Sequence, residues 1–285
     1  MTPPADGFAA LDPVIQHHVV NTLGWPALRP LQEHAIQPVL SGHDALLLAP
    51  TAGGKTEAAM FPLLTRMTSE HWQGLSVLYV CPLKALLNNL EPRLTAYTSW
   101  LGRRASVRHG DTGQGERRRQ ALDRPDVLLT TPESLESMLV SRLLDPKLVF
   151  ADVRAVVVDE VHAFAGDDRG WHLLAVLERL TALTGRPMQR IGLSATVGNA
   201  PELLGWLQGS NRASGRAADV VAPEVAGTVE PDLTLDYVGT VDNAATVISA
   251  LHHGEKRLIF ADSRRTVETL AEGLRDRHTE TFVSH

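Results

Sequence analysis

The sequence predicts an α/β fold in which a parallel β-sheet carries helices on both of its faces. Short apolar runs recur along the chain without alternating polar residues, and such runs are typical of strands buried on both faces. Segments with helical composition lie between these runs. Alternation of strand and helix in this way indicates a parallel sheet.

Each element is expected from its own residue pattern. The expected strands lie at 44–49, 76–81, 105–109, 126–130, 154–159 and 188–194. The helices expected between them lie at 55–68, 83–99, 114–122, 133–144 and 171–184. Two further helices, at 13–23 and 31–40, precede the first strand, and each ends at a glycine, as helices often do. Pro38 should bend or shorten the second of these.

The character of the sequence changes after about residue 207. Residues 208–218 are rich in Gly, Ser, Asn and Arg and lack periodicity, which is typical of a loop or hinge. The expected division is a domain at 1–210, a linker at 211–232 and a partial second domain at 233–285. In the last part, strands are expected at 233–238 and 257–261 and an extended segment at 280–283, with helices at 243–252 and 265–277. These roughly 50 residues are too few to close a domain with its own core.

Composition excludes several classes of protein. The net charge of −6 gives no basic field that would attract nucleic acid, so any such contact must be local. The lone cysteine, Cys81, excludes a disulfide framework and a cysteine-based zinc site, and it is expected to be a small buried residue. No apolar run of about 18 residues and no signal sequence is present, so a soluble cytoplasmic protein without membrane contact is expected.

A candidate phosphate-binding loop has the sequence Ala-Pro-Thr-Ala-Gly-Gly-Lys-Thr at 49–56, between an expected strand and an expected helix. Gly53 and Gly54 allow backbone N–H groups to turn inward, and the helix start adds positive partial charge. Lys55 is expected to reach the β- and γ-phosphates, and Thr56 to ligate Mg²⁺. An ordinary glycine-rich turn is the alternative. The residues expected to line ATP here are Thr51, Ala52, Gly53, Gly54, Lys55 and Thr56.

An acidic pair, Asp159-Glu160, ends the expected strand at 154–159. Carboxylates at the carboxyl end of a parallel strand lie in the crevice where ligands bind. Asp159 is expected to hold Mg²⁺ through water, and Glu160 to orient and deprotonate the attacking water. A solvated strand end is the alternative. Together with Lys55, these are the expected catalytic residues, and they predict an ATP·Mg²⁺ site.

The order of several segments resembles the superfamily 2 DEAD/DEAH-box helicases, most closely the Lhr (large helicase-related) group and next the Ski2-like helicases. In these helicases alanine is usual where Ala49 stands. The resemblance implies a RecA-like P-loop domain followed by the start of a second RecA-like lobe. The segments that carry it are Arg-Pro-Leu-Gln at 29–32, the loop at 49–56, Cys-Pro-Leu-Lys-Ala-Leu at 81–86, His-Gly-Asp-Thr at 109–112, Thr-Thr-Pro-Glu-Ser-Leu at 130–135, Asp-Glu-Val-His at 159–162, Leu-Ser-Ala-Thr-Val-Gly-Asn at 193–199 and Leu-Ile-Phe-Ala-Asp-Ser-Arg-Arg at 258–265.

The resemblance also implies roles for further residues. Gln32 is expected to pair with the adenine edge through its amide, the alternative being a solvated glutamine at a helix start. Helix starts that follow strands could take phosphates of a nucleic acid, and simple helix capping is the alternative. The residues expected at nucleic acid are Pro82, Lys84, Asp111, Thr131, Pro132, Glu133, Ser263 and Arg264. Those expected to couple the two sites are His162, Ser194 and Thr196, the hydroxyls bonding Asp159 or His162.

The function expected from the resemblance is an ATP-dependent helicase or translocase, moving 3′ to 5′, with ATP and Mg²⁺ as cofactors and single-stranded or tailed DNA or RNA as partner. The resemblance also implies a role in DNA repair or RNA handling, in a bacterial or archaeal cytosol. Two alternatives stay open: a switch module that binds ATP and nucleic acid without motor activity, and a P-loop ATPase that acts on another target.

The chain is expected to be an N-terminal portion of such a helicase. The second lobe normally supplies an arginine that stabilises the transferring phosphoryl group and raises the rate by about 10³–10⁵. No segment resembling that part is present, so this ATP hydrolase is expected to be impaired without the remainder of the second lobe, in the same or a partner chain.

Overall fold

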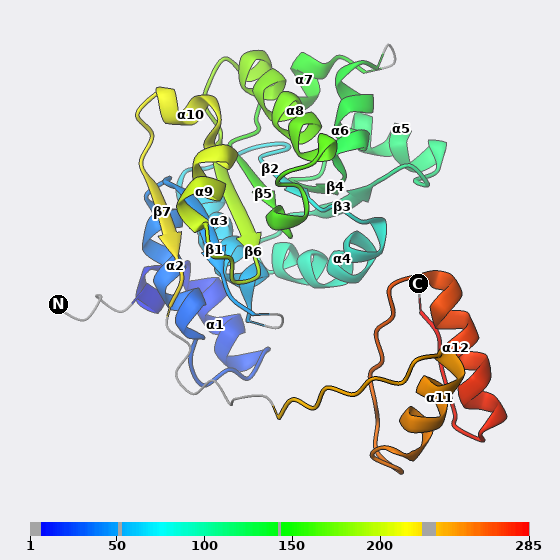
Figure 1. Cartoon of the computed structure of the whole chain (residues 1–285). Helices are drawn as coiled ribbons and strands as arrows, with labels where there is room; N and C mark the ends of the chain where they lie inside the picture. Colours follow the sequence, from blue (N-terminus) through cyan, green and yellow to red (C-terminus); the bar gives the residue numbers. More distant parts are fainter. Residues whose placement is uncertain (1–6, 51–52, 142–143, 224–231, 285) are drawn as a thin grey trace. The chain divides into compact units, whose positions relative to one another are not determined.

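A seven-stranded, all-parallel sheet lies at the centre of the first of two structural units, Met1–Glu224 and Val225–His285 (Figure 1). The computed structural model describes residues 7–50, 53–141, 144–223 and 232–284. The strand order is β3-β4-β2-β5-β6-β1-β7. The strands are β1 (Asp44–Leu48), β2 (Val77–Val80), β3 (Ala105–Arg108), β4 (Val127–Thr130), β5 (Ala155–Val158), β6 (Gln189–Ser194) and β7 (Ala218–Val221). The predicted parallel α/β architecture is confirmed.

Helices cover both faces of this sheet (Figure 1). The helices of the first unit are α1 (Pro13–Asn21), α2 (Pro30–Leu40), α3 (Lys55–Ser69), α4 (Lys84–Ser99), α5 (Gln114–Leu122), α6 (Pro132–Leu139), α7 (Pro146–Phe150), α8 (Asp168–Thr184), α9 (Ala200–Gln208) and α10 (Ser210–Ala213), with short 3₁₀ turns η1 (Gly7–Ala10) and η2 (Val161–Ala163). Of these, α7, α9 and α10 were not expected. Pro38 lies inside α2 and does not end it early.

Alternate residues of β1, β2, β4 and β5 supply two separate cores. Ala45 and Leu47 of β1 pack with α1 to α4, whereas Leu46 and Leu48 pack with α6 to α9. Because successive side chains of a strand point to opposite faces, burial of both faces requires a continuous apolar run. Burial of both faces of the sheet therefore explains why the apolar runs in the sequence are not interrupted by alternating polar residues.

The register brings the carboxyl ends of the central strands to one edge of the sheet. Leu48 of β1 lies opposite Ser194 of β6, and Val80 of β2 lies opposite both Thr130 of β4 and Val158 of β5. The segments after β2 and β4 and the acidic pair after β5 therefore begin at the same level, and β1 and β6 extend two residues farther along the same edge. This edge is where open parallel sheets bind ligands.

Strand β7 lies within the residues expected as a linker, so that expectation is wrong for this stretch. It pairs with β1 in parallel, from Asp44 opposite Ala218 to Leu47 opposite Val221. Only Val221 of the four β7 residues is buried, so its sequence lacks the apolar run of a central strand. An edge strand needs little apolar surface when its neighbour supplies the hydrogen bonds.

A buried carboxylate, Asp44, fastens this side of the sheet. Its oxygens accept hydrogen bonds from the backbone N–H of Arg190 at 2.8 Å, from Asn211 Nδ2 at 3.0 and 3.2 Å and from Gln208 Nε2 at 3.3 Å. Arg216 Nε lies 3.3 Å from Asp44 Oδ1. Burial raises the pKa of Asp44, opposed by these hydrogen bonds and by Arg216. The network ties the connection between α9 and β7 to the start of β1.

The second unit contains α11 (Val241–Ala250) and α12 (Arg264–Asp276), which pack through Ala245, Leu270 and Leu274. The strands expected at 233–238 and 257–261 are not formed, which corrects the prediction. A strand is stabilised by hydrogen bonds to a neighbouring strand, and the described residues of this unit provide none. Apolar side chains of these segments are consequently exposed, including Leu235 and Phe260.

Across the described ranges, every helix is too short or too polar to cross a membrane.

Replacing Asp44 with alanine should lower the free energy of unfolding by about 3–5 kcal/mol, because several buried donors and Arg216 lose their acceptor. The matched control is Asp219→Ala on the neighbouring β7. Asp219 pairs with His43 at 2.6 Å, but both side chains are about two-fifths exposed (38% and 42%). Its loss should cost no more than about 1 kcal/mol. Chemical denaturation measures both, and equal costs would contradict this role for Asp44.

Candidate active site

The candidate phosphate loop connects β1 to α3 at the carboxyl edge of the sheet. The backbone N–H of Ala49 donates to the carbonyl of Ser194 at 3.2 Å, which joins the start of the loop to the end of β6. Within the loop, the N–H of Gly53 donates to the carbonyl of Pro50 at 3.0 Å. Two of the residues expected to line ATP, Thr51 and Ala52, lie outside the described residues.

Both glycines of the loop occupy positions that exclude a side chain. A Cβ on Gly53 would lie 2.5 Å from the Cβ of Ala49, closer than real Cβ contacts. Gly54 has a φ of +77°, in the left-handed region, and a Cβ there would lie 2.3 Å from Gln32 Nε2. The close approach of Ala49 and Gln32 thus explains the Gly-Gly pair in physical terms.

The ammonium group of Lys55 closes the loop on itself. Its Nζ donates to the carbonyl of Ala49 at 2.9 Å and to the carbonyl of Pro50 at 3.3 Å. The side chain is nearly buried, as is Thr56, the next residue of α3. Since an ammonium has three N–H donors, these contacts hold Lys55 at the loop and leave a donor for another acceptor.

Gln32 is packed against the loop rather than solvated. It is 1% exposed, its Oε1 accepts from the backbone N–H of Arg29 at 2.9 Å, and its Nε2 lies 3.4 Å from the carbonyl oxygen of Gly54. The alternative of a solvated glutamine at a helix start is therefore wrong. The amide joins the start of α2 to the loop.

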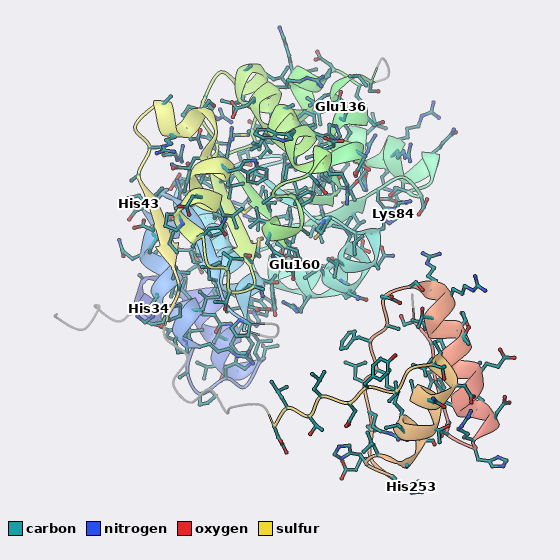
Figure 2. All side chains as sticks on the ribbon, in the orientation of Figure 1. His34, His43, Lys84, Glu136, Glu160 and His253 are labelled. Atoms are coloured by element: carbon teal, nitrogen blue, oxygen red, sulfur yellow. The ribbon has the colours of Figure 1, made fainter. Side chains whose placement is uncertain are left out.

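The acidic pair places one buried and one accessible carboxylate after β5. Asp159 is 9% exposed; its Oδ1 accepts from the N–H of Glu160 at 2.9 Å, and its backbone N–H donates to the carbonyl of Val80 at 2.8 Å. Burial raises the pKa of Asp159, partly opposed by a hydrogen bond from Tyr79. Glu160, labelled in Figure 2, has a left-handed backbone with a φ of 47° and a side chain that is 35% exposed.

Tyr79 of β2 connects the loop to the acidic pair, and sequence reasoning missed it. Its hydroxyl donates to Asp159 Oδ2 at 3.0 Å and lies 3.4 Å from Thr56 Oγ1. The ring is fully buried, and burial raises the pKa of Tyr79 well above its usual range, so the hydroxyl keeps its proton. The sequence feature that could have identified Tyr79 is a tyrosine inside a strand buried on both faces, because its hydroxyl needs a hydrogen-bond partner there.

Two of the three expected coupling residues meet at this edge. The imidazole of His162 lies with Nδ1 3.0 Å from Ser194 Oγ and with Nε2 3.5 Å from Glu160 Oε2. Ser194 is fully buried, whereas Thr196 is exposed. The structure therefore links the end of β6 to the acidic pair through His162 and not through Thr196.

The residues expected at nucleic acid fall into separate groups. Thr131 caps α6, since its Oγ1 accepts from the N–H of Ser134 at 3.4 Å, and Pro132 is the first helical residue. Helix capping therefore accounts for Thr131 at least in part. Lys84, labelled in Figure 2, is half exposed and forms an ion pair with Asp111 at 2.8 Å.

The carbonyl of Pro82 and the carboxylate of Glu133 both accept from Arg169, at 2.9 and 2.8 Å. Sequence reasoning did not identify Arg169. Ser263 and Arg264 lie in the second unit, where Ser263 caps α12 by accepting from the N–H of Thr266 at 3.1 Å.

Cys81 is buried beside this site. Its Sγ lies 3.9 Å from Asp159 Oδ2, and burial next to Asp159 raises the pKa of the thiol. Within the described part of the chain, no group of three or more His, Cys, Asp or Glu side chains could hold a metal ion. Any cation at this edge would need ligands besides such a cluster.

Comparison with known proteins gives a family and several relatives. The sequence profile of the DEAD/DEAH box helicases matches residues 29–204. The chain is 36% identical to the Lhr helicase/probable uracil glycosylase of Mycolicibacterium smegmatis, over 91% of this chain and 18% of that protein. It is 33% identical to the ATP-dependent helicase Lhr-Core of Methanothermobacter thermautotrophicus, over 88% of this chain and 32% of that protein. The chain thus spans less than two-thirds of the length of these relatives.

Solved structures agree with the fold. The helicase Lhr of Mycobacterium smegmatis, bound to single-stranded DNA and AMP-PNP, superposes with a TM-score of 0.78 at 35% identity, covering 96% of this chain and 37% of that chain. The DUF1998 helicase MrfA, bound to DNA and AMPPNP, superposes with a TM-score of 0.73 at 21% identity, covering 94% and 38%, which shows the fold alone. The expected RecA-like architecture and the resemblance to the Lhr group are confirmed.

Replacing Gly54 with alanine should lower the free energy of unfolding by about 1–2 kcal/mol, since a Cβ is unfavourable at a positive φ. Gln32 would also have to leave its place against the loop. Gly115→Ala in α5 is the matched control, because a Cβ there meets nothing within 4 Å. That change should preserve or raise stability through helix propensity. Chemical denaturation of both variants gives the comparison, and an unchanged Gly54→Ala midpoint would contradict the crowding argument.

Proposed function

Because this chain belongs to the DEAD/DEAH box helicase family, we propose that it carries the ATP-binding lobe of a nucleic-acid helicase or translocase. The observation that carries the proposal is the contact chain from Thr56 through the Tyr79 hydroxyl to Asp159, with separations of 3.4 and 3.0 Å. It joins the start of the loop helix to the acidic pair. We also propose that the first RecA-like lobe extends through β7 and that residues 232–284 belong to a second.

In this proposal the loop binds the phosphates of ATP. Backbone N–H groups at the start of α3 give this end of the helix a positive partial charge, and the donor that Lys55 has left beyond its bonds to the carbonyls of Ala49 and Pro50 reaches the β- and γ-phosphates. Gln32, fixed against Gly54, is placed to read the adenine edge. Its burial makes the amide a rigid donor and acceptor rather than a mobile one.

Thr56 and Asp159 fit a magnesium site. Mg²⁺ is commonly held by one or two protein oxygens, with phosphate oxygens and water completing its shell, so a cluster of three acids is not required. Bound there, Mg²⁺ would neutralise charge on the phosphates. The hydroxyl of Thr56 and the carboxylate of Asp159 lie on either side of the Tyr79 hydroxyl.

Glu160 is proposed as the general base. Its carboxylate is about a third exposed, unlike the buried Asp159, so it can reach a water molecule in front of the phosphates. His162 contacts both Glu160 and Ser194, at 3.5 and 3.0 Å, and is proposed to relay changes at the phosphates to the end of β6.

Nucleic acid is the proposed partner. The relative that superposes at 35% identity was solved with single-stranded DNA and AMP-PNP, which supports a single strand as ligand here. Movement 3′ to 5′, a role in DNA repair, and a cytosolic location rest on the resemblance to the Lhr group. The phosphoryl-stabilising arginine is proposed to come from the remainder of the second lobe.

Two variants distinguish the proposed role of Glu160 in ATP turnover from that of Lys55 in nucleotide binding. Glu160→Gln keeps the shape and removes the base, so nucleotide affinity should stay within about twofold while ATP turnover falls about 10²–10⁴-fold. Lys55→Ala should weaken nucleotide binding itself. Binding of a fluorescent ATP analogue is measured with this chain, and turnover with a protein that also contains a complete second lobe. Identical behaviour of the two variants at saturating ATP would refute the assignment.

The Tyr79 hydroxyl is tested through Mg²⁺ dependence. Tyr79→Phe should raise the Mg²⁺ concentration needed for half-maximal nucleotide binding by about 10-fold or more, because groups that orient a metal ligand contribute about 10–100-fold to affinity. Tyr97→Phe is the matched control, since the Tyr97 hydroxyl also donates to a buried carboxylate, Glu57 Oε1, at 2.9 Å. The control should leave the Mg²⁺ requirement unchanged, and equal shifts in both variants would overturn the role of Tyr79.

A further inference from the structure

Arg169, the second residue of α8, joins three segments at the carboxyl edge of the sheet. Its Nη2 donates to the carbonyl of Pro82 at 2.9 Å and to Glu133 Oε1 at 2.8 Å, and its Nε lies 3.1 Å from the same Oε1. Its guanidinium also lies over the ring of Phe164, 5.6 Å from the ring centre. Pro82 precedes α4, Glu133 lies in the first turn of α6, and Phe164 follows the acidic pair.

We propose that Arg169 is a positioning residue for nucleic acid: it holds the starts of α4 and α6 at a fixed separation and fastens both to the segment that follows Asp159-Glu160. This inference rests on the proposed function, because it assumes that these helix starts contact the phosphates of a strand.

The start of α4 is suited to a phosphate. Its N-cap residue, Leu83, forms no side-chain cap, so the first backbone N–H groups of the helix are not satisfied by a cap. Lys84, the first helical residue, adds a cation. The carbonyl held by Arg169 belongs to Pro82, immediately before this cap. Fixing that carbonyl fixes the direction in which the free N–H groups point.

In this proposal Glu133 supports the helix starts through Arg169 and does not contact the strand directly. A carboxylate repels the phosphates of a nucleic acid, so a direct contact would be unfavourable. Its pairing with Arg169 gives it a structural use in place of that contact. The planar guanidinium can donate hydrogen bonds to the carbonyl of Pro82 and to the carboxylate of Glu133 at the same time. The ammonium of a lysine lacks this planar, forked arrangement of donors.

Helices α6 and α8 are joined by a second ion pair, which provides a control for the pair between Arg169 and Glu133. Arg179 of α8 lies 2.6 Å from Glu136 of α6, and its Nη1 donates to both oxygens of that carboxylate. Ten residues of helix, or about 15 Å, separate it from Arg169. Arg179→Lys is therefore a control that alters contact between α6 and α8 without touching the start of α4.

Binding of a fluorescent oligothymidylate, measured by anisotropy at several salt concentrations, tests the proposal. Arg169→Lys keeps the charge and loses the fork, so affinity should fall about tenfold, the size expected for one charge-assisted hydrogen bond. The dependence of affinity on salt should not change, because no phosphate contact is removed. Lys84→Ala should instead reduce that salt slope by about one, and Arg179→Lys should match the wild type.

Amide hydrogen exchange supplies a second readout that does not depend on nucleic acid. Arg169→Lys should speed exchange in the first turns of both α4 and α6, and Arg179→Lys should not. Wild-type affinity for the oligonucleotide in Arg169→Lys, or unchanged exchange at both helix starts, overturns the inference. A wild-type chain that fails to bind the oligonucleotide counts against the proposed function, and the exchange comparison then still decides whether Arg169 positions the two helices.

Discussion

The register of the parallel strands, which brings their carboxyl ends to one edge of the sheet, is the constraint on which the rest of the structure depends. Hydrogen bonding between β1, β6, β5, β2 and β4 leaves no freedom in where each strand stops relative to its neighbours. Segments separated by more than a hundred residues in the sequence therefore begin at the same carboxyl edge of the sheet. Strand pairing alone brings together the candidate phosphate loop, the acidic pair and the starts of α4 and α6. Local side chains then set the orientation of each segment.

Those local groups are polar side chains at the ends of the strands and in the turns that follow them; Tyr79 and its partners are buried, whereas His162 and Glu160 are partly exposed. Tyr79 links Thr56 and Asp159, and His162 links Glu160 and Ser194. In a site of low dielectric, a polar group without a partner is costly, so the buried link through Tyr79 is favoured once the apolar packing has excluded water. The same burial that builds the two cores thus also orders the candidate site.

The proposed function requires an acidic chain to hold a polyanion. In that proposal the N–H groups at the start of α4 and one cation, Lys84, act at close range, where they outweigh the screened effect of a net charge of −6 on the whole chain. The Lys84–Asp111 pair is largely exposed, so it holds little free energy that a phosphate would have to replace. Local geometry, more than overall charge, governs this kind of contact.

The sequence by itself determined the parallel α/β architecture, the loop at 49–56 and the acidic pair, because continuous apolar runs, glycines and charged strand ends are local signals. Only the tertiary structure decided the partners of Gln32 and Tyr79, which come from distant segments. It also decided β7, whose four residues become a strand because β1 offers an open edge held by the Asp44 network. The apolar segments of the second unit show the converse: a strand pattern forms no strand where no neighbour supplies its hydrogen bonds.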